Sequence, residues 1–135
     1  CPLTTETRGL VAADLIARMK PSAWLLNVSR GAVVDEPALV EALRAKRIGG
    51  AVLDVFATQP LPPDHPLREC SNAIFTPHVA GLSIESARET SAIVATDTLH
   101  VLRGEPPVHL YNREIWPAFL ERRRALGWPV RGLRQ

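Results

Sequence analysis

Three short apolar runs, each with a polar residue at or just after its end, constrain the fold of this chain more than any other feature. The runs span residues 23–28, 51–55 and 73–76. Such short, nearly continuous runs are typical of strands that are buried on both faces of a sheet. Strands that alternate with helices pair in parallel through right-handed crossovers. The pattern therefore predicts an α/β protein with a parallel sheet.

The segments around these runs predict helices and one long loop. Residues 11–19, 36–45 and 83–103 place apolar residues at helical spacing, with Ser83 as a capping residue and Gly104 as a stop. Residues 57–72 contain four prolines and predict an irregular loop. Three short strands are too few for a stable open sheet. We therefore expect the carboxy-terminal half of a doubly wound, Rossmann-type domain, with a long returning helix and a basic tail.

Composition and charge narrow the class of protein. The chain of 135 residues is 46% hydrophobic and 22% charged, which allows a packed core. The last 23 residues hold six arginines and two glutamates, but their apolar residues recur at roughly helical spacing. We therefore expect an amphipathic helix there, and no nucleic-acid partner.

Other partners and compartments are also constrained by the sequence. No apolar run approaches the roughly 18 residues that span a bilayer, so no membrane partner is expected. Two cysteines and no metal-ligand spacing predict neither a disulfide scaffold nor a metal site, and we expect a cytoplasmic protein. The chain opens on Cys1-Pro2 without a methionine, and our interpretation is a carboxy-terminal fragment.

One polar residue lies at or just after the end of each apolar run. Arg30, Asp54 and His78 are separated by 24 residues each. Ligands of open parallel sheets bind outside the carboxyl ends of the strands, so these three side chains are expected at one edge. Taken singly, they could be a surface arginine in a turn, a loop-capping carboxylate and a structural histidine. Their convergence favours a functional site.

An arginine, a carboxylate and a histidine at one edge support a limited set of reactions. An arginine offers two parallel donors to a carboxylate, and a histidine gives or takes a proton near neutrality. An acid at the sheet edge can accept a hydrogen bond from a carboxamide. Together these properties fit hydride transfer between a hydroxy acid and a nicotinamide cofactor.

Six stretches, in this order, resemble the D-isomer-specific 2-hydroxyacid dehydrogenases, which use NAD or NADP. They are CPLTTET at residues 1–7, MKP at 19–21, NVSRG at 27–31, LDVF at 53–56, TPHVAG at 76–81 and RGEPP at 103–107. The resemblance covers residues 1 to about 112, and the tail matches nothing in the family.

The resemblance implies a role for each matching residue. Arg30 would bind the substrate carboxylate, His78 would be the acid/base, and Asp54 would hold the nicotinamide carboxamide. The full set of cofactor-binding residues implied in this way is Cys1, Val28, Ser29, Arg30, Asp54, His78 and Gly81.

It also implies a domain organisation and partners. Residues 1–104 would form part of an NAD(P)-binding domain that includes the long crossover helix, and residues 105–135 would be a tail on a substrate domain. A small 2-hydroxy or 2-keto acid would be the substrate, and the full-length protein would be a homodimer. Neither the particular substrate nor the choice between NAD and NADP follows from these residues.

Two departures from the family pattern stand out. The chain contains no GxG, so the glycine-rich cradle for pyrophosphate is absent and the chain alone is expected to bind NAD poorly. Gln59 occupies the place of the usual glutamate beside the histidine, and we expect it to make His78 less basic than in relatives with glutamate. Gln59 joins Arg30 and His78 as a candidate catalytic residue.

Gln59 also keeps two other functions open. Formate dehydrogenases of the same superfamily resemble this loop in having Gln-Pro followed by Asp-His-Pro and Arg, as at residues 59–60 and 64–68. Formate oxidation moves no proton, so a neutral pair of glutamine and histidine suffices. A non-catalytic nucleotide-binding protein, like the related co-repressors, is the second alternative.

Overall fold

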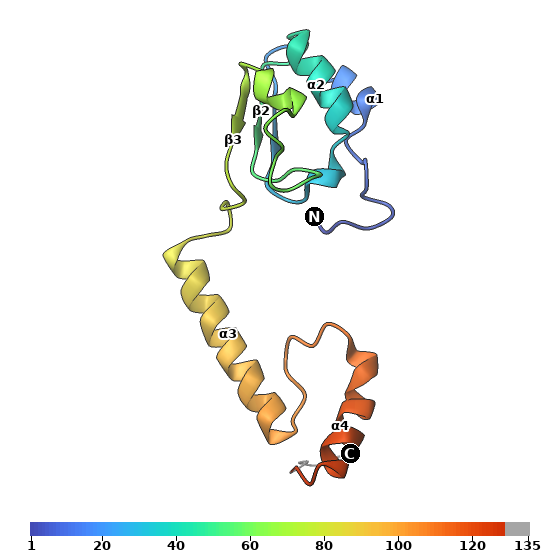
Figure 1. Cartoon of the computed structure of the whole chain (residues 1–135), viewed down its shortest axis with the longest axis vertical. Helices are drawn as coiled ribbons and strands as arrows, with labels where there is room; N and C mark the ends of the chain where they lie inside the picture. Colours follow the sequence, from blue (N-terminus) through green and yellow to red (C-terminus); the bar gives the residue numbers. More distant parts are fainter. Residues whose placement is uncertain (129–135) are drawn as a thin grey trace. The chain divides into compact units, whose positions relative to one another are not determined.

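The computed structural model describes residues 1–128, and the chain divides into two compact units, Cys1–Gly81 and Leu82–Gln135 (Figure 1). We describe each unit by itself. The first unit holds the sheet, and the second begins one residue before the cap of the long helix. The boundary predicted at residue 104 remains an expectation.

A three-stranded parallel sheet forms the centre of the first unit. The strands β1 (Trp24–Asn27), β2 (Gly50–Leu53) and β3 (Ala73–Phe75) lie in the order β1-β2-β3. Asn27 pairs with Leu53, and Leu53 pairs in turn with Phe75, so the three strands end nearly level. The α/β class and all three strands predicted from the apolar runs are confirmed.

Helices and short turns connect the strands. Helix α2 (Glu36–Arg44) begins at Asp35, whose carboxylate accepts a hydrogen bond of 3.1 Å from the amide of Ala38. It buries Leu39 and Leu43 against the sheet, where they join a core that also contains Ile48, Ala51, Leu53 and Leu67. The predicted irregular loop contains a single 3-10 turn, η2 (Pro66–Glu69), and another turn, η1 (Gly31–Val33), follows β1.

Two expectations for this unit need correction. Helix α1 covers only Ala13–Ala17, because the amide of Val11 donates to Val33 and Val11 forms a parallel bridge with Val34 instead. Strand β1 is not buried on both faces. Leu25 and Asn27 are buried, whereas Trp24 and Leu26 are 46% and 67% exposed, so one face of β1 has no layer over it among the described residues.

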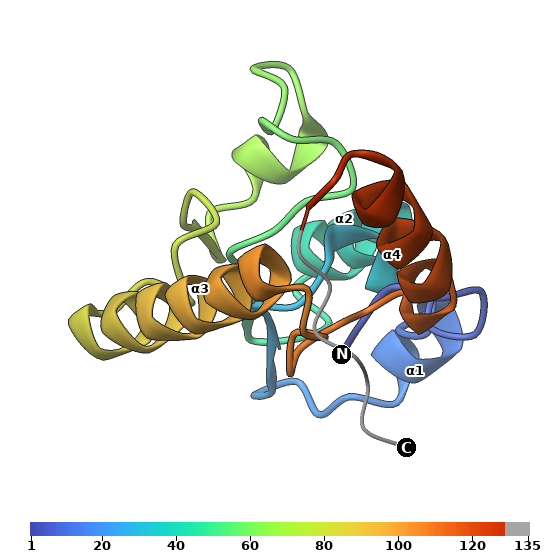
Figure 2. The same cartoon turned by 90° about the horizontal axis from the view of Figure 1, so that it is seen from below.

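The second unit is helical. Helix α3 (Ile84–Arg103) runs without interruption, as Figures 1 and 2 show. Ser83 and Ser86 form a reciprocal capping box at its start, and Gly104 ends it in the left-handed conformation at φ 74°. Both ends are as predicted. The apolar face expected along this helix contains no buried residue.

The basic tail folds back as a helix. A 3-10 turn, η3 (Arg113–Ile115), leads into α4 (Trp116–Ala125), which buries Trp116 and Leu120. Arg123 is only 3% exposed and donates 2.9 Å hydrogen bonds to the last carbonyls of α3, those of Val101 and Leu102. This arginine therefore connects the two helices. The tail contains a helix as predicted, but the expected apolar face is incomplete, because Ile115, Leu126 and Trp128 are exposed. The end of the tail, residues 129–135, lies outside the described residues.

A search of residues 1–128 for membrane spans finds no helix with the length and apolar character needed to cross a bilayer.

Candidate functional site

The polar residues that follow the strands lie at the carboxyl edge of the sheet. Asp54 comes directly after β2, while Arg30 and His78 each come three residues after the ends of β1 and β3. Because the strands are parallel and end level, these positions share one edge, as the spacing predicts.

Asp54 holds the segment that carries His78. Its side chain is 1% exposed, and Oδ1 accepts hydrogen bonds from the Thr76 hydroxyl and from the amide of Val79 at 2.9 Å. Its Oδ2 accepts one from the amide of Ala80, also at 2.9 Å. The hydroxyl of Thr76, followed by these two amides, lowers the pKa of Asp54 against the opposing effect of burial. An ionised Asp54 therefore fixes the backbone on both sides of position 78.

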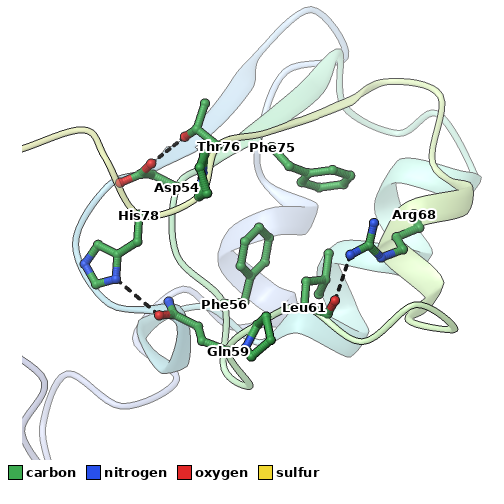
Figure 3. A pocket seen from close by; sticks show the side chains of 10 residues that line it. Asp54, Phe56, Gln59, Leu61, Arg68, Phe75, Thr76 and His78 are labelled. Atoms are coloured by element: carbon green, nitrogen blue, oxygen red, sulfur yellow. Dashed lines mark hydrogen bonds between the residues drawn. The ribbon is translucent and has the colours of Figure 1, made fainter.

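His78 is held in a conformation that L-residues rarely adopt. Its φ is 58°, in the left-handed region, where non-glycine residues need compensating interactions. Nδ1 of its ring lies 3.2 Å from Oε1 of Gln59, and Figure 3 shows the ring turned toward that amide. Within residues 1–128, Nε2 has no hydrogen-bond partner, and the side chain is exposed. The ring is thus anchored through one nitrogen and presents the other to solvent.

The turn after β1 positions Arg30. The buried Asn27 side chain donates from Nδ2 to the carbonyl of Arg30 at 3.0 Å. Its Oδ1 accepts from the amide and the hydroxyl of Ser29, at 3.1 and 2.9 Å. The Arg30 side chain is exposed, and its Nη1 donates to the Ser29 carbonyl at 2.7 Å.

Gly31 packs this turn directly against the turn after β2. A Cβ at position 31 would lie 1.9 Å from the carbonyl carbon of Phe56 and 2.3 Å from the amide nitrogen of Ala57. No side chain fits in that space, so glycine is required for the approach. The close contact fixes the segment carrying Arg30 beside the segment that leaves Asp54.

A cavity of about 540 Å³ opens beside these residues, between β2, β3 and the proline-rich loop (Figure 3). Phe56 and Phe75 form one wall and meet edge to face with 5.8 Å between their ring centroids. The other lining residues are Asp54, Gln59, Pro60, Leu61, Arg68, Thr76, Pro77 and His78. The structure thus brings Asp54, Gln59 and His78 together around one hollow, whereas Arg30 is not among its lining residues.

The other residues expected to bind the cofactor do not line this cavity. Val28 is exposed, Ser29 is turned onto Asn27, and Cys1 is exposed at the start of the chain. At Gly81 an added Cβ would meet no described atom within 4 Å.

Three contributors were missed by sequence reasoning. Asn27, Thr76 and Arg68 hold, respectively, the turn of Arg30, the carboxylate of Asp54 and the loop of Gln59. Asn27 and Thr76 stand inside the NVSRG and TPHVAG stretches, so their positions beside candidate residues were an available signal. Arg68 stands in the stretch at residues 64–68 that resembles formate dehydrogenases, but that pattern does not predict its two bonds, which depend on how the loop folds back.

The helix ends within the described residues offer no cradle for a pyrophosphate. Asp35 and Glu36 occupy the start of α2, where a negative charge on a ligand would be repelled, and Ser83 caps α3. The carboxyl edge places His78, which can transfer a proton, and the exposed Arg30, which can bind an anion, where a small carboxylate substrate would need them beside the nicotinamide end of such a cofactor. The donor set therefore suits one end of a dinucleotide.

The chain is similar in sequence to known proteins. The family described as "D-isomer specific 2-hydroxyacid dehydrogenase, NAD binding domain" matches residues 1–80. A glyoxylate reductase of Thermofilum pendens is 44% identical over 114 residues, which are 84% of this chain and 34% of that protein. A D-3-phosphoglycerate dehydrogenase of Synechocystis is 49% identical over 106 residues, which are 78% of this chain and 19% of that protein. The chain thus spans about a third or less of these curated relatives.

Solved structures show the same fold. The TT0316 protein of Thermus thermophilus superposes with a TM-score of 0.73 at 42% identity, over 80% of this chain and 34% of that one. The D-lactate dehydrogenase of Lactobacillus jensenii, solved with NAD+, superposes with a TM-score of 0.73 at 32% identity, over 84% of this chain and 38% of that one.

Proposed function

This chain belongs to the D-isomer specific 2-hydroxyacid dehydrogenase family, in its NAD-binding domain, and from that premise we propose the reaction that its site serves. We propose that the chain supplies the acid/base and carboxylate-binding groups of an NAD- or NADP-dependent enzyme that interconverts small D-2-hydroxy acids and 2-keto acids. The observation that carries the proposal is His78, anchored through Nδ1 at the carboxyl edge of the sheet, with Nε2 presented outward.

In the reduction, the roles divide between two side chains. The exposed guanidinium of Arg30 binds the substrate carboxylate through parallel N–H donors and polarises the adjacent carbonyl. His78, as an imidazolium, gives its Nε2 proton to the keto oxygen, and in the oxidation the neutral ring takes a proton from the hydroxyl. A nicotinamide cofactor, when bound, would supply the hydride-transfer chemistry.

The remaining site residues position these two. Oε1 of Gln59 accepts a hydrogen bond from Nδ1–H of His78, and this contact keeps Nε2 directed outward. Asp54 is almost fully covered, and its role in this geometry is to hold residues 79 and 80. Oδ2 accepts one described bond, so it retains the capacity for a carboxamide donor as well. Cys1, Val28, Ser29 and Gly81 would line the cofactor.

Substrate size and assembly are further parts of the proposal. The sequence relatives include a glyoxylate reductase, which supports a small 2-keto acid such as glyoxylate or hydroxypyruvate. Family membership supports a homodimer, and the free thiols of Cys1 and Cys70 are consistent with a reducing cytoplasm.

A chimera tests the activity. The chain replaces the matching third of the Thermofilum pendens glyoxylate reductase, which provides the rest of an enzyme. NADH or NADPH absorbance is then followed with glyoxylate, hydroxypyruvate and phenylpyruvate, and the unmodified relative is the control. Turnover of a 2-keto acid is the expected result. Cofactor binding without turnover of any of them contradicts the proposal and favours a non-catalytic nucleotide-binding protein.

The neutral pair formed by Gln59 and His78 favours formate oxidation as a second candidate. The same chimera distinguishes it, because formate with NAD+ would then give NADH while the three keto acids would not be reduced.

A further inference from the structure

The loop that carries Gln59 receives little support from core packing around that residue. Residues 57–60 are all exposed, and the first buried side chain beyond them is Leu61. An exposed segment of this kind takes its position from hydrogen bonds at its ends. The position of the Gln59 amide relative to His78 therefore depends on what holds the backbone on either side.

One tether lies two residues before Gln59. Oε1 of the buried Glu36, at the start of α2, accepts a 2.6 Å hydrogen bond from the amide of Ala57. The same glutamate lies 3.5 Å from Nε2 of His65, at the far end of the loop.

The second tether begins two residues after Gln59 and is made by Arg68. Nε of Arg68 donates to the carbonyl of Pro62 at 2.8 Å. Nη2 donates to the carbonyl of Leu61 at 2.7 Å, as Figure 3 shows. Two bonds from one planar guanidinium to consecutive carbonyls fix direction as well as distance.

The backbone of Arg68 is held in place by the hydrophobic core. It belongs to the turn η2, and its neighbour Leu67 is fully buried in the core. The imidazole Nδ1 of His65 caps this turn by accepting from the amide of Leu67. The guanidinium therefore connects the core to the loop of Gln59.

We propose that Arg68 is a positioning residue, which holds Gln59 through residues 61–62 and thereby determines which ring nitrogen of neutral His78 carries the proton. The atom of Gln59 that faces the ring is the amide oxygen, which only accepts hydrogen bonds. Neutral His78 then keeps its proton on Nδ1 and leaves the lone pair on Nε2. If Gln59 is released, water competes for both nitrogens and the preference weakens.

The catalytic meaning of this inference rests on the proposed function, because a free lone pair on Nε2 is what oxidation of a hydroxy acid requires. The tautomer itself is a property of the chain and is measurable without cofactor or substrate.

Nitrogen NMR of the histidine rings in the full chain tests the inference, at a pH where His78 is neutral. Arg68→Met removes the donors and keeps the apolar stem, and Gln59→Ala removes the acceptor. We expect each change to lower the ratio of the Nδ1–H to the Nε2–H form by roughly two- to fivefold, the scale of one solvent-exposed hydrogen bond. Arg68→Lys, which can reach one carbonyl, is expected to fall between the wild type and Arg68→Met.

A double variant and a matched control separate positioning from general loosening. Adding Arg68→Met to Gln59→Ala should produce no further change, because both act on one contact. Arg47→Met removes another exposed arginine, whose described partner is Glu41 of α2, and should leave the ratio as in the wild type. A wild-type ratio in a folded Arg68→Met, or a further drop in the double variant, overturns the inference.

Two remaining results are also decisive. If Arg68→Met does not fold, Arg68→Lys is judged in its place, and an unchanged ratio there overturns the inference. If the predicted tautomer changes occur but the chimera turns over no 2-keto acid, the proposed function is wrong and the role of Arg68 stands.

Discussion

Gln59 and His78, 19 residues apart in sequence, meet with 3.2 Å between Oε1 of the amide and Nδ1 of the imidazole. An amide at this place orients the ring without adding charge beside it. A carboxylate in the same position would favour the imidazolium form. Gln59 therefore orients the imidazole of His78 without a charge, so substitution with glutamate can test the effect of charge separately.

Gln59→Glu tests the electrostatic half of that statement. The new carboxylate attracts the charged ring, so we expect the imidazolium form of His78 to persist to higher pH than in the wild type. Proton NMR titration of the full chain measures this shift. In the chimera, the pH above which reduction slows should move in the same direction. An unmoved titration would mean that position 59 does not face the ring in solution.

Asp54→Asn tests the anchoring of residues 79–80. Hydrogen bonds from Thr76 and two amides lower the pKa of Asp54, so its contribution to stability is present above the ordinary value of 3.8. That contribution is lost as pH falls through the lowered, folded-state pKa. We expect the variant to melt at a lower temperature near neutral pH, and this deficit to shrink below about pH 4.

Thermal midpoints followed by circular dichroism across pH check this behaviour. Asp14→Asn, at an exposed carboxylate 4.0 Å from Arg18, is the matched control and should show no such trend. A deficit of equal size at every pH would show that the charge of Asp54 is not what stabilises the loop.

Gly31→Ala tests the close approach of the first two turns. The added methyl would lie 1.9 Å from the Phe56 carbonyl carbon, so the two backbones must separate. Forced overpacking of this kind costs about 1–3 kcal/mol, and backbone on the far side gives way less readily than a side chain. Urea unfolding of the sheet-containing unit measures the loss. Gly81→Ala, where no described atom lies within 4 Å, should unfold like the wild type, and equal losses would argue against the contact.

Arg30→Ala tests the carboxylate anchor in the chimera. Loss of the charged, parallel donors should lower kcat/KM for the 2-keto acid by roughly 10- to 100-fold. Arg30→Lys should recover only part of this, because lysine is a point charge without the forked geometry. Arg18→Ala removes an exposed arginine directly after α1 and should leave kcat/KM unchanged. Unaltered kinetics in Arg30→Ala would remove it from the site.

The order of helices and strands was predictable because buried strands appear as apolar runs and helices as apolar residues at helical spacing. Residues 51–55 and 73–76 read as strands, and the stop at Gly104 and the cap at Ser83 were recognised from residue type alone. The shared edge of Arg30, Asp54 and His78 followed from parallel topology. The prediction for β1 was less complete, since its apolar run does not say whether a second layer covers Trp24 and Leu26.

The internal bonds of the site were not predictable in the same way. Asp54 uses its oxygens on residues 76, 79 and 80, and Arg68 folds back onto the carbonyls of Leu61 and Pro62. Both arrangements depend on how loops close, and local sequence carries little information about loop closure. The role of Gln59 beside His78 came from the family pattern rather than from spacing.

His78→Ala in the chimera tests the central claim most directly. NADH oxidation with saturating glyoxylate, compared with His100→Ala as a control at a half-buried histidine of α3, gives the effect on kcat. If His78 transfers the proton, kcat falls by roughly 100-fold or more while the control retains full activity. A loss of less than a few-fold in a folded variant would contradict the account, because the proton would then come from another group.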